Sequence, residues 1–162
     1  MQFIHTTNDP WHRVGGEDGP VPHPKPTPHL LLSLEQWHAV RDTWPADCPV
    51  GVQLGNTAEV EDLADDLPRL ALVALNFPKW VDGRAYSQAH VLRARLGYRG
   101  QVRATGDVVV DMLPMLQRTG FDAVQLRADQ QESSARRALS LVTEHYQGDV
   151  AQTRPIFARV PA

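Results

Sequence analysis

Cysteine is almost absent from this chain of 162 residues, because Cys48 is the only one. One cysteine excludes an internal disulfide, a zinc site built of cysteines alone and a cysteine-ligated iron–sulfur cluster. Apolar runs that approach the ~20 residues of a membrane-spanning helix are also lacking. Residues 1–5 show no basic region followed by an apolar one, so we expect no signal peptide, no membrane association and a cytoplasmic location.

Positive charge is scarce as well. The chain has 16 Lys and Arg residues against 19 Asp and Glu residues, a net charge of −3, so we expect no nucleic-acid partner. Only Lys25 and Lys79 are lysines. The planar guanidinium of arginine can bind a planar anion with two hydrogen bonds, which the ammonium group of lysine cannot do. A GC-rich genome also produces an excess of arginine over lysine. The remaining composition, 42% hydrophobic and 22% charged, suits one globular domain of ordinary size.

Proline is concentrated near the N-terminus, and residues 21–28 must be extended because proline restricts φ and the residue before it. Two short apolar runs, residues 3–5 and 11–14, precede this segment and are separated by the turn signal Asn8-Asp9-Pro10. We therefore predict an N-terminal β-hairpin and a Pro-rich arm over residues 1–28. The same reasoning predicts an α/β domain over 29–150 and a C-terminal tail over 151–162.

Short apolar runs alternate with helical stretches from residue 29 onward. This alternation predicts βα units and a parallel sheet of about five strands. Ser33 and Gln36 form a capping-box signal at a helix start, and Gly97 and Gly120 mark helix ends. The expected strands are Leu30–Leu34, Val50–Leu54, Leu70–Phe77, Gln101–Thr105 and Ala123–Leu126.

Three of these strands have one polar face. Gln53, Arg103 and Gln125 alternate with apolar residues at the period of a strand. A doubly wound sheet buries both faces and has continuous apolar strands, so the alternation favours a partial barrel with helices mainly on one face. A complete eight-unit barrel needs ~250 residues. The doubly wound three-layer sheet remains the alternative, and a second copy could cover the polar face in a homodimer.

Functional residues of both architectures gather at the carboxyl ends of the strands. Arg84 follows the third strand and opens the next helix, where it either pairs with Asp82 or Asp107 or meets an anion. Arg103 is a charge within a strand and needs a partner or solvent. We expect these side chains to converge in one cleft for an anion or other ligand. The expected cleft comprises Arg84, Ser87, Gln88, Arg103 and Asp107, with Asp82, Asn76 and Asp111 in support.

No cofactor motif accompanies these residues. The sequence lacks G-x-G-x-x-G, Walker A, C-x-x-C and G-x-S-x-G patterns, so we predict no cofactor and assign no catalytic residue. Asp107 and Asp111 could share a hard cation if the segment were helical, but separate helix capping is the simpler interpretation, and we predict no metal. Trp80 is the one aromatic residue in the loops at the strand ends that could contact a ligand or partner.

Several segments together resemble an uncharacterised bacterial family, a domain of unknown function. The resemblance covers residues 30 to 147. Two positions depart from the family pattern: Met112 stands in place of glutamine, and Thr119 in place of cysteine. The segments that carry it are Leu75–Pro78, Asp82–Ala89, Leu92-Arg93, Gly97-Tyr98, Arg103–Val108, Asp111 and Gly120–Ala123.

Members of that family are usually encoded beside a ferredoxin-type sulfite reductase and are labelled probable oxidoreductases of sulfite reduction. The resemblance therefore implies a role in sulfur assimilation. Because this chain lacks the residue sets of a redox centre, we favour an accessory role that binds an anion or the sulfite reductase itself. One alternative is an oxidoreductase acting directly in sulfite reduction. Another is a small barrel-like lyase or isomerase that uses Arg84, Arg103 and Asp107.

Overall fold

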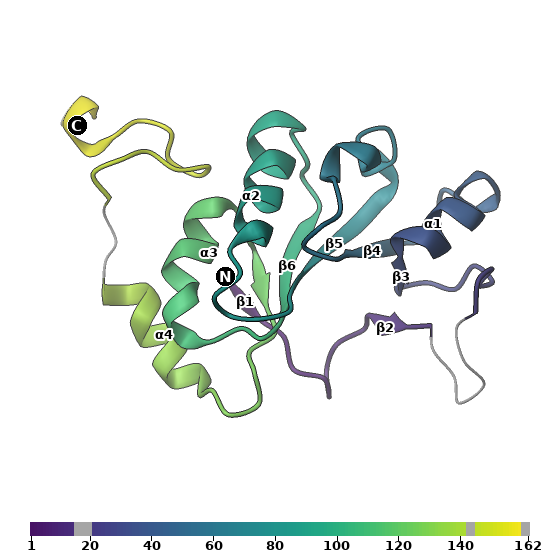
Figure 1. Cartoon of the computed structure of the whole chain (residues 1–162), viewed down its shortest axis with the longest axis horizontal. Coiled ribbons are helices and arrows are strands. Elements are labelled where there is room, and N and C mark those ends of the chain that lie inside the picture. Colours follow the sequence, from purple (N-terminus) through teal and green to yellow (C-terminus); the bar gives the residue numbers. More distant parts are fainter. Residues whose placement is uncertain (15–20, 142–144, 160–162) are drawn as a thin grey trace.

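The structure is a computed structural model that describes residues 1–14, 21–141 and 145–159. Its centre is one sheet of seven parallel strands in the order β1-β7-β6-β5-β4-β3-β2. The sheet curls into a half-barrel with helices around it (Figure 1). The expected α/β fold with a partial-barrel-like parallel sheet is thereby confirmed, with seven strands in place of about five.

All five expected strands are present, and β5 lies at the centre between β4 and β6. Strands β3, β4, β5 and β6 begin and end within one residue of the bounds expected from the sequence, whereas β7 is shorter than expected. The strands are β1 Gln2–Phe3, β2 His12–Arg13, β3 Leu30–Ser33, β4 Val50–Leu54, β5 Leu70–Phe77, β6 Gln101–Gly106 and β7 Ala123–Val124.

The two faces of the sheet differ in polarity as the alternation predicts. On the convex face, apolar side chains such as Val52 and Leu75 are fully buried in the main core under the helices. On the concave face, the register places Gln53, Ala74 and Arg103 side by side on three neighbouring strands. The concave face therefore carries the polar groups, and it decides what the half-barrel can bind.

The helices are short, and several expected ends are correct. Ser33 and Gln36 form the expected capping box, and Gly120 ends a helix in the left-handed conformation with φ of 105°. The α-helices are α1 Leu34–Val40, α2 Arg84–His90, α3 Leu113–Thr119 and α4 Glu132–Leu141. Short turns are η1 Arg41–Thr43, η2 Val60–Leu63, η3 Leu67–Arg69, the π-turn η4 Val91–Arg95, η5 Val110–Met112 and η6 Ile156–Ala158. None of the helices in these described ranges is both long and apolar enough to cross a membrane.

The predicted N-terminal hairpin is wrong. β1 pairs with β7 at one edge of the sheet, and β2 pairs with β3 at the opposite edge, both in parallel. Each strand is only two residues long, so a partner far away in the sequence decides its position. Part of the expected arm, residues 15–20, lies outside the described residues. Residues 21–29 form neither helix nor strand; they contain a bend at residues 22–23 and a turn at residues 28–29, so the segment is not extended throughout.

Residues 4–11, which we call the strap, connect the two edge strands across the concave face (Figure 1). The strap is not fully extended, because residues 6–8 form a turn in which the N–H of Asn8 donates to the carbonyl of His5 at 3.0 Å. Along a flat sheet, six strand spacings would amount to about 29 Å. Curling of the sheet shortens this path. Trp11 at the end of the strap packs on Leu31, Leu72 and Ala74, the only apolar cluster described on the concave side. The strap thus covers the part of the concave face where Trp11 and Asp9 contact the sheet.

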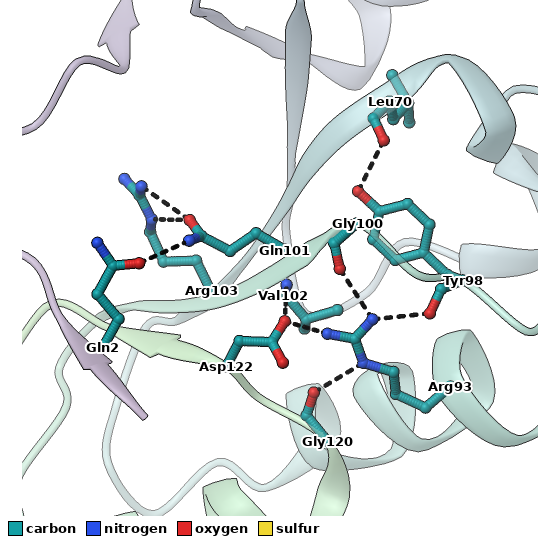
Figure 2. A network of polar contacts seen from close by, with 10 residues as sticks. All are labelled: Gln2, Leu70, Arg93, Tyr98, Gly100, Gln101, Val102, Arg103, Gly120 and Asp122. Carbon is teal, nitrogen blue, oxygen red and sulfur yellow. Dashed lines mark hydrogen bonds and ion pairs between the residues drawn. The ribbon is translucent and has the colours of Figure 1, made fainter.

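A clamp around Arg93 closes the amino-terminal ends of the strands (Figure 2). Its guanidinium donates to the carbonyls of Tyr98, Gly100 and Gly120 at 2.7–2.9 Å and forms an ion pair with Asp122. These contacts tie η4 to the loops before β6 and β7. Because the donors of Arg93 are engaged by the protein itself, this end of the half-barrel is structural.

Candidate functional site

The loops after β4 and β5 meet at the Asp82 carboxylate. Asn56 donates its amide to Asp82 Oδ2 at 2.7 Å, and Arg84 grips both oxygens through Nε at 3.0 Å and Nη2 at 2.6 Å. The bonds from Arg84 hold the pKa of Asp82 down at about 2, and Asp82 in turn raises the pKa of Arg84. Of the two partners expected for Arg84, Asp82 is the one it takes.

A second carboxylate joins the loops after β5, β6 and β7. Asp107 accepts the backbone N–H of Trp80 at 2.9 Å and Nη1 of Arg127 at 2.7 Å. Arg127 also donates through Nε to Asp129 at 2.6 Å. These bonds lower the pKa of Asp107, lower that of Asp129 to about 2 and raise that of Arg127. Asp107 is neither a free ligand nor a partner of Arg84; it fixes the loop that carries Trp80.

Arg103 lies on the concave face, and its described hydrogen bonds go to neither Asp82 nor Asp107. Its guanidinium is 3% exposed and donates to both carboxylate oxygens of Asp9 in the strap, at 2.6 and 3.2 Å. Gln101, two residues earlier on the same strand, accepts two further bonds from it (Figure 2). The charge within the strand is thus fully paired, as its burial requires.

Arg84, Arg103 and Asp107 therefore have three separate partners, and among the described residues no hydrogen bond or ion pair joins any two of them. The expected site residues on α2 do share a hollow. Arg84, Ser87 and Gln88 line a cavity of about 480 Å³ together with Asn56 and the acidic residues Glu59 and Glu61. Arg84 is paired with Asp82, and Glu61 is paired with Arg95 at 3.2 Å, so Glu59 adds a negative charge to the hollow and disfavours an anion there.

Gln88 has a structural role in this hollow. Its side-chain Nε2 donates to the carbonyls of Gly55 and Ala58 at 2.9 and 2.8 Å, and this fixes the loop after β4 against α2. Asn76 is half-buried beside Gly106, whose φ of 93° brings the two strand ends close. Asp111 lies exposed on η5, with no side-chain bond to another described residue. Gln88 thus connects α2 to the loop after β4, whereas Asn76 and Asp111 lie outside the cavity that Gln88 lines.

Trp80 and Val81 form an apolar tip between the two charged networks. Trp80 is 56% exposed and Val81 66% exposed, although both are large apolar residues. The tip is held from both sides, since the Trp80 N–H is bonded to Asp107 and the Asp82 carboxylate follows directly after Val81. A fixed, exposed apolar tip with charged neighbours is suited to contact with another protein.

Two ion-pair partners of the candidate site residues, Asp9 and Arg127, were not among the residues expected from the sequence. Asp9 reads as a turn residue, and its contact with Arg103 spans 94 positions in the chain. Arg127 follows directly after a predicted strand. Its place at the carboxyl end of a strand was the one sequence feature that pointed to its contacts with Asp107 and Asp129. The chemistry of these groups is charge pairing. The described part of the chain holds no cluster of three or more His, Cys, Asp or Glu residues placed to bind a metal ion.

One comparison with known proteins gives a match. The model of a family described as "Bacterial protein of unknown function (DUF934)" matches residues 51–157, about two thirds of the chain. The matched segment includes β4, β5, β6 and β7 with both charged networks and the Trp80 tip. No curated protein matches the sequence.

Proposed function

We propose that this chain, which belongs to the DUF934 family of bacterial proteins of unknown function, is an accessory protein of assimilatory sulfite reduction that docks on the sulfite reductase. The sulfur pathway comes from the sequence resemblance to proteins encoded beside that enzyme. The docking role comes from the carboxyl ends of the strands, where parallel α/β sheets carry their functional groups.

The exposed apolar tip of Trp80 and Val81 is the single observation that carries this proposal. Tryptophan is the residue type most enriched among those that dominate binding energy at protein interfaces. Asp107 and Asp82 fix the loop in advance, so little conformational entropy is lost when a partner covers it. The flanking Arg84 and Arg127 pairs supply the charged rim that surrounds such a contact.

An accessory role also agrees with the composition. Reduction of sulfite to sulfide transfers several electrons. The sulfite reductase encoded beside the resembling proteins carries the sirohaem and the iron–sulfur cluster for this reaction. With Cys48 as its only cysteine, this chain has no cysteine set for such a cluster. The lyase or isomerase alternative needs Arg84, Arg103 and Asp107 in one site, and their separate partners give it no specific support.

Binding to the purified sulfite reductase of the same host tests the proposal. We expect Trp80→Ala to raise the dissociation constant at least about tenfold, because truncation of a dominant interface tryptophan costs about 2 kcal/mol or more. Calorimetry or surface plasmon resonance measures this change. Met115→Ala is the matched control, since Met115 is also apolar and 47% exposed but lies on α3. Absence of binding by the unsubstituted protein, or equal affinity of both variants, would contradict docking through the tip.

A further inference from the structure

The carboxylate of Asp9 pairs with the Arg103 guanidinium on the concave face. The Arg103 guanidinium meets it with two nitrogens, which is the way arginine grips oxyanions. Asp9 is itself only 14% exposed, and Thr105 on the same strand face is 2% exposed. The Arg103–Asp9 pair is therefore largely removed from solvent, on an inner strand of the sheet.

Stability alone does not explain this arrangement. A buried ion pair is often no more stabilising than apolar side chains of similar volume. The neighbouring position on β5 is Ala74, and the cluster next to it is apolar. A hydrophobic pair at Asp9 and Arg103 would continue that cluster. The pair therefore places a desolvated guanidinium on this face, with its counter-charge supplied by the strap.

The strap that delivers Asp9 is fixed at its ends and weakly held between them. Ile4 is buried and Trp11 packs on the sheet, whereas Thr6, Thr7 and Asn8 are exposed. Besides Asp9, the side-chain contact described for this middle part with the rest of the molecule is the exposed pair of His5 with Glu132 at 2.8 Å. Residues 5–10 can therefore move away without loss of the buried anchors.

We propose that Asp9 is an internal counter-anion for a small-oxyanion site at Arg103, and that displacement of residues 5–10 opens this site to a small sulfur oxyanion such as sulfate or sulfite. The incoming anion replaces the Asp9 carboxylate on the guanidinium, while Gln101 keeps its two bonds from Arg103. In the resting protein the site is closed, so the apparent affinity is reduced by the fraction of molecules with an open strap. The proposal does not depend on the Trp80 tip.

Sulfate titration of Asp9→Asn tests the proposal. This change keeps the shape of the side chain and removes the competing charge, so we expect sulfate to bind at least about tenfold more tightly than to the unsubstituted protein. Calorimetry against sodium chloride of equal ionic strength measures the difference. Asp9→Asn/Arg103→Met should show no such binding, and Trp80→Ala should leave it unchanged. Equal sulfate affinity of Asp9→Asn and the double variant would overturn the proposal.

Hydrogen exchange of the unsubstituted protein provides a second test that does not require a folded variant. Sulfate generally slows exchange because it strengthens burial of apolar surface. We expect concentrated sodium sulfate to accelerate exchange at the amides of residues 5–9 while the remaining amides slow down. Slower exchange of residues 5–9 together with the rest would contradict displacement of the strap.

Discussion

Asp82 shows how a single residue organises the strand ends. It accepts bonds from Asn56 after β4 and from Arg84 at the start of α2, so one carboxylate connects two loops. The pairing with Arg84 is predictable from sequence because the residues are two positions apart. The pairing of Arg103 with Asp9 is not, because only the folded chain brings together residues 94 positions apart.

The low pKa of Asp82 has a defined pH dependence. A carboxylate with a folded-state pKa near 2 stabilises the fold above its ordinary pKa, and this contribution disappears as the pH falls toward 2. We expect Arg84→Ala to raise the pKa of Asp82 toward its ordinary value, as followed by the ¹³C shift of its carboxyl carbon. Arg127→Ala is the control and should move Asp107 and Asp129 but not Asp82. Titration of Asp82 near pH 2 in Arg84→Ala would contradict the assigned cause.

At the scale of elements, the sequence predicted those features that residues close together in the chain determine. The capping box of Ser33 with Gln36 and the end of α3 at Gly120 are set by nearby residues, and both were predicted. The polar positions Gln53, Arg103 and Gln125 predicted the one-sided sheet. β1 and β2 were misplaced because two-residue strands carry no periodicity of their own, and their partners lie elsewhere in the sheet.

Packing of the strap on the sheet depends on Gly51 of β4. A Cβ atom there would lie 3.0 Å from both Leu72 Cβ and Trp11 Cζ3. We expect Gly51→Ala to lower the free energy of unfolding by about 1–3 kcal/mol through overpacking, measured by urea denaturation. Gly55→Ala is the control, since no atom lies within 4 Å of its Cβ position, and its effect should be small. Equal stability of both variants would show that Trp11 is not seated tightly on β4.

The whole molecule is a half-barrel in which the amino-terminal and carboxyl-terminal ends of the strands carry different side-chain contacts. The strap crosses its concave face. Arg93 closes the amino-terminal ends of the strands, and Asp82 and Asp107 organise the carboxyl ends around the Trp80 tip. Alternation in the sequence predicted the open polar face but not its cover, because the strap is identified only by contacts between distant residues. Arg84, Arg103 and Asp107, which were expected in one cleft, each pair with a different residue, and the proposed docking tip and oxyanion site rest on different ones of these pairs.

Growth of a gene-deletion strain of the bacterial host tests the central claim most directly. If the protein supports sulfite reduction by docking, the deletion strain should grow slowly on sulfate or sulfite and normally on cysteine. The unsubstituted gene and Met115→Ala should restore growth on sulfate, and Trp80→Ala should not, although its product accumulates to the same level. Normal growth of the deletion strain on sulfate would contradict a role in the pathway, and full restoration by Trp80→Ala would contradict docking through the tip.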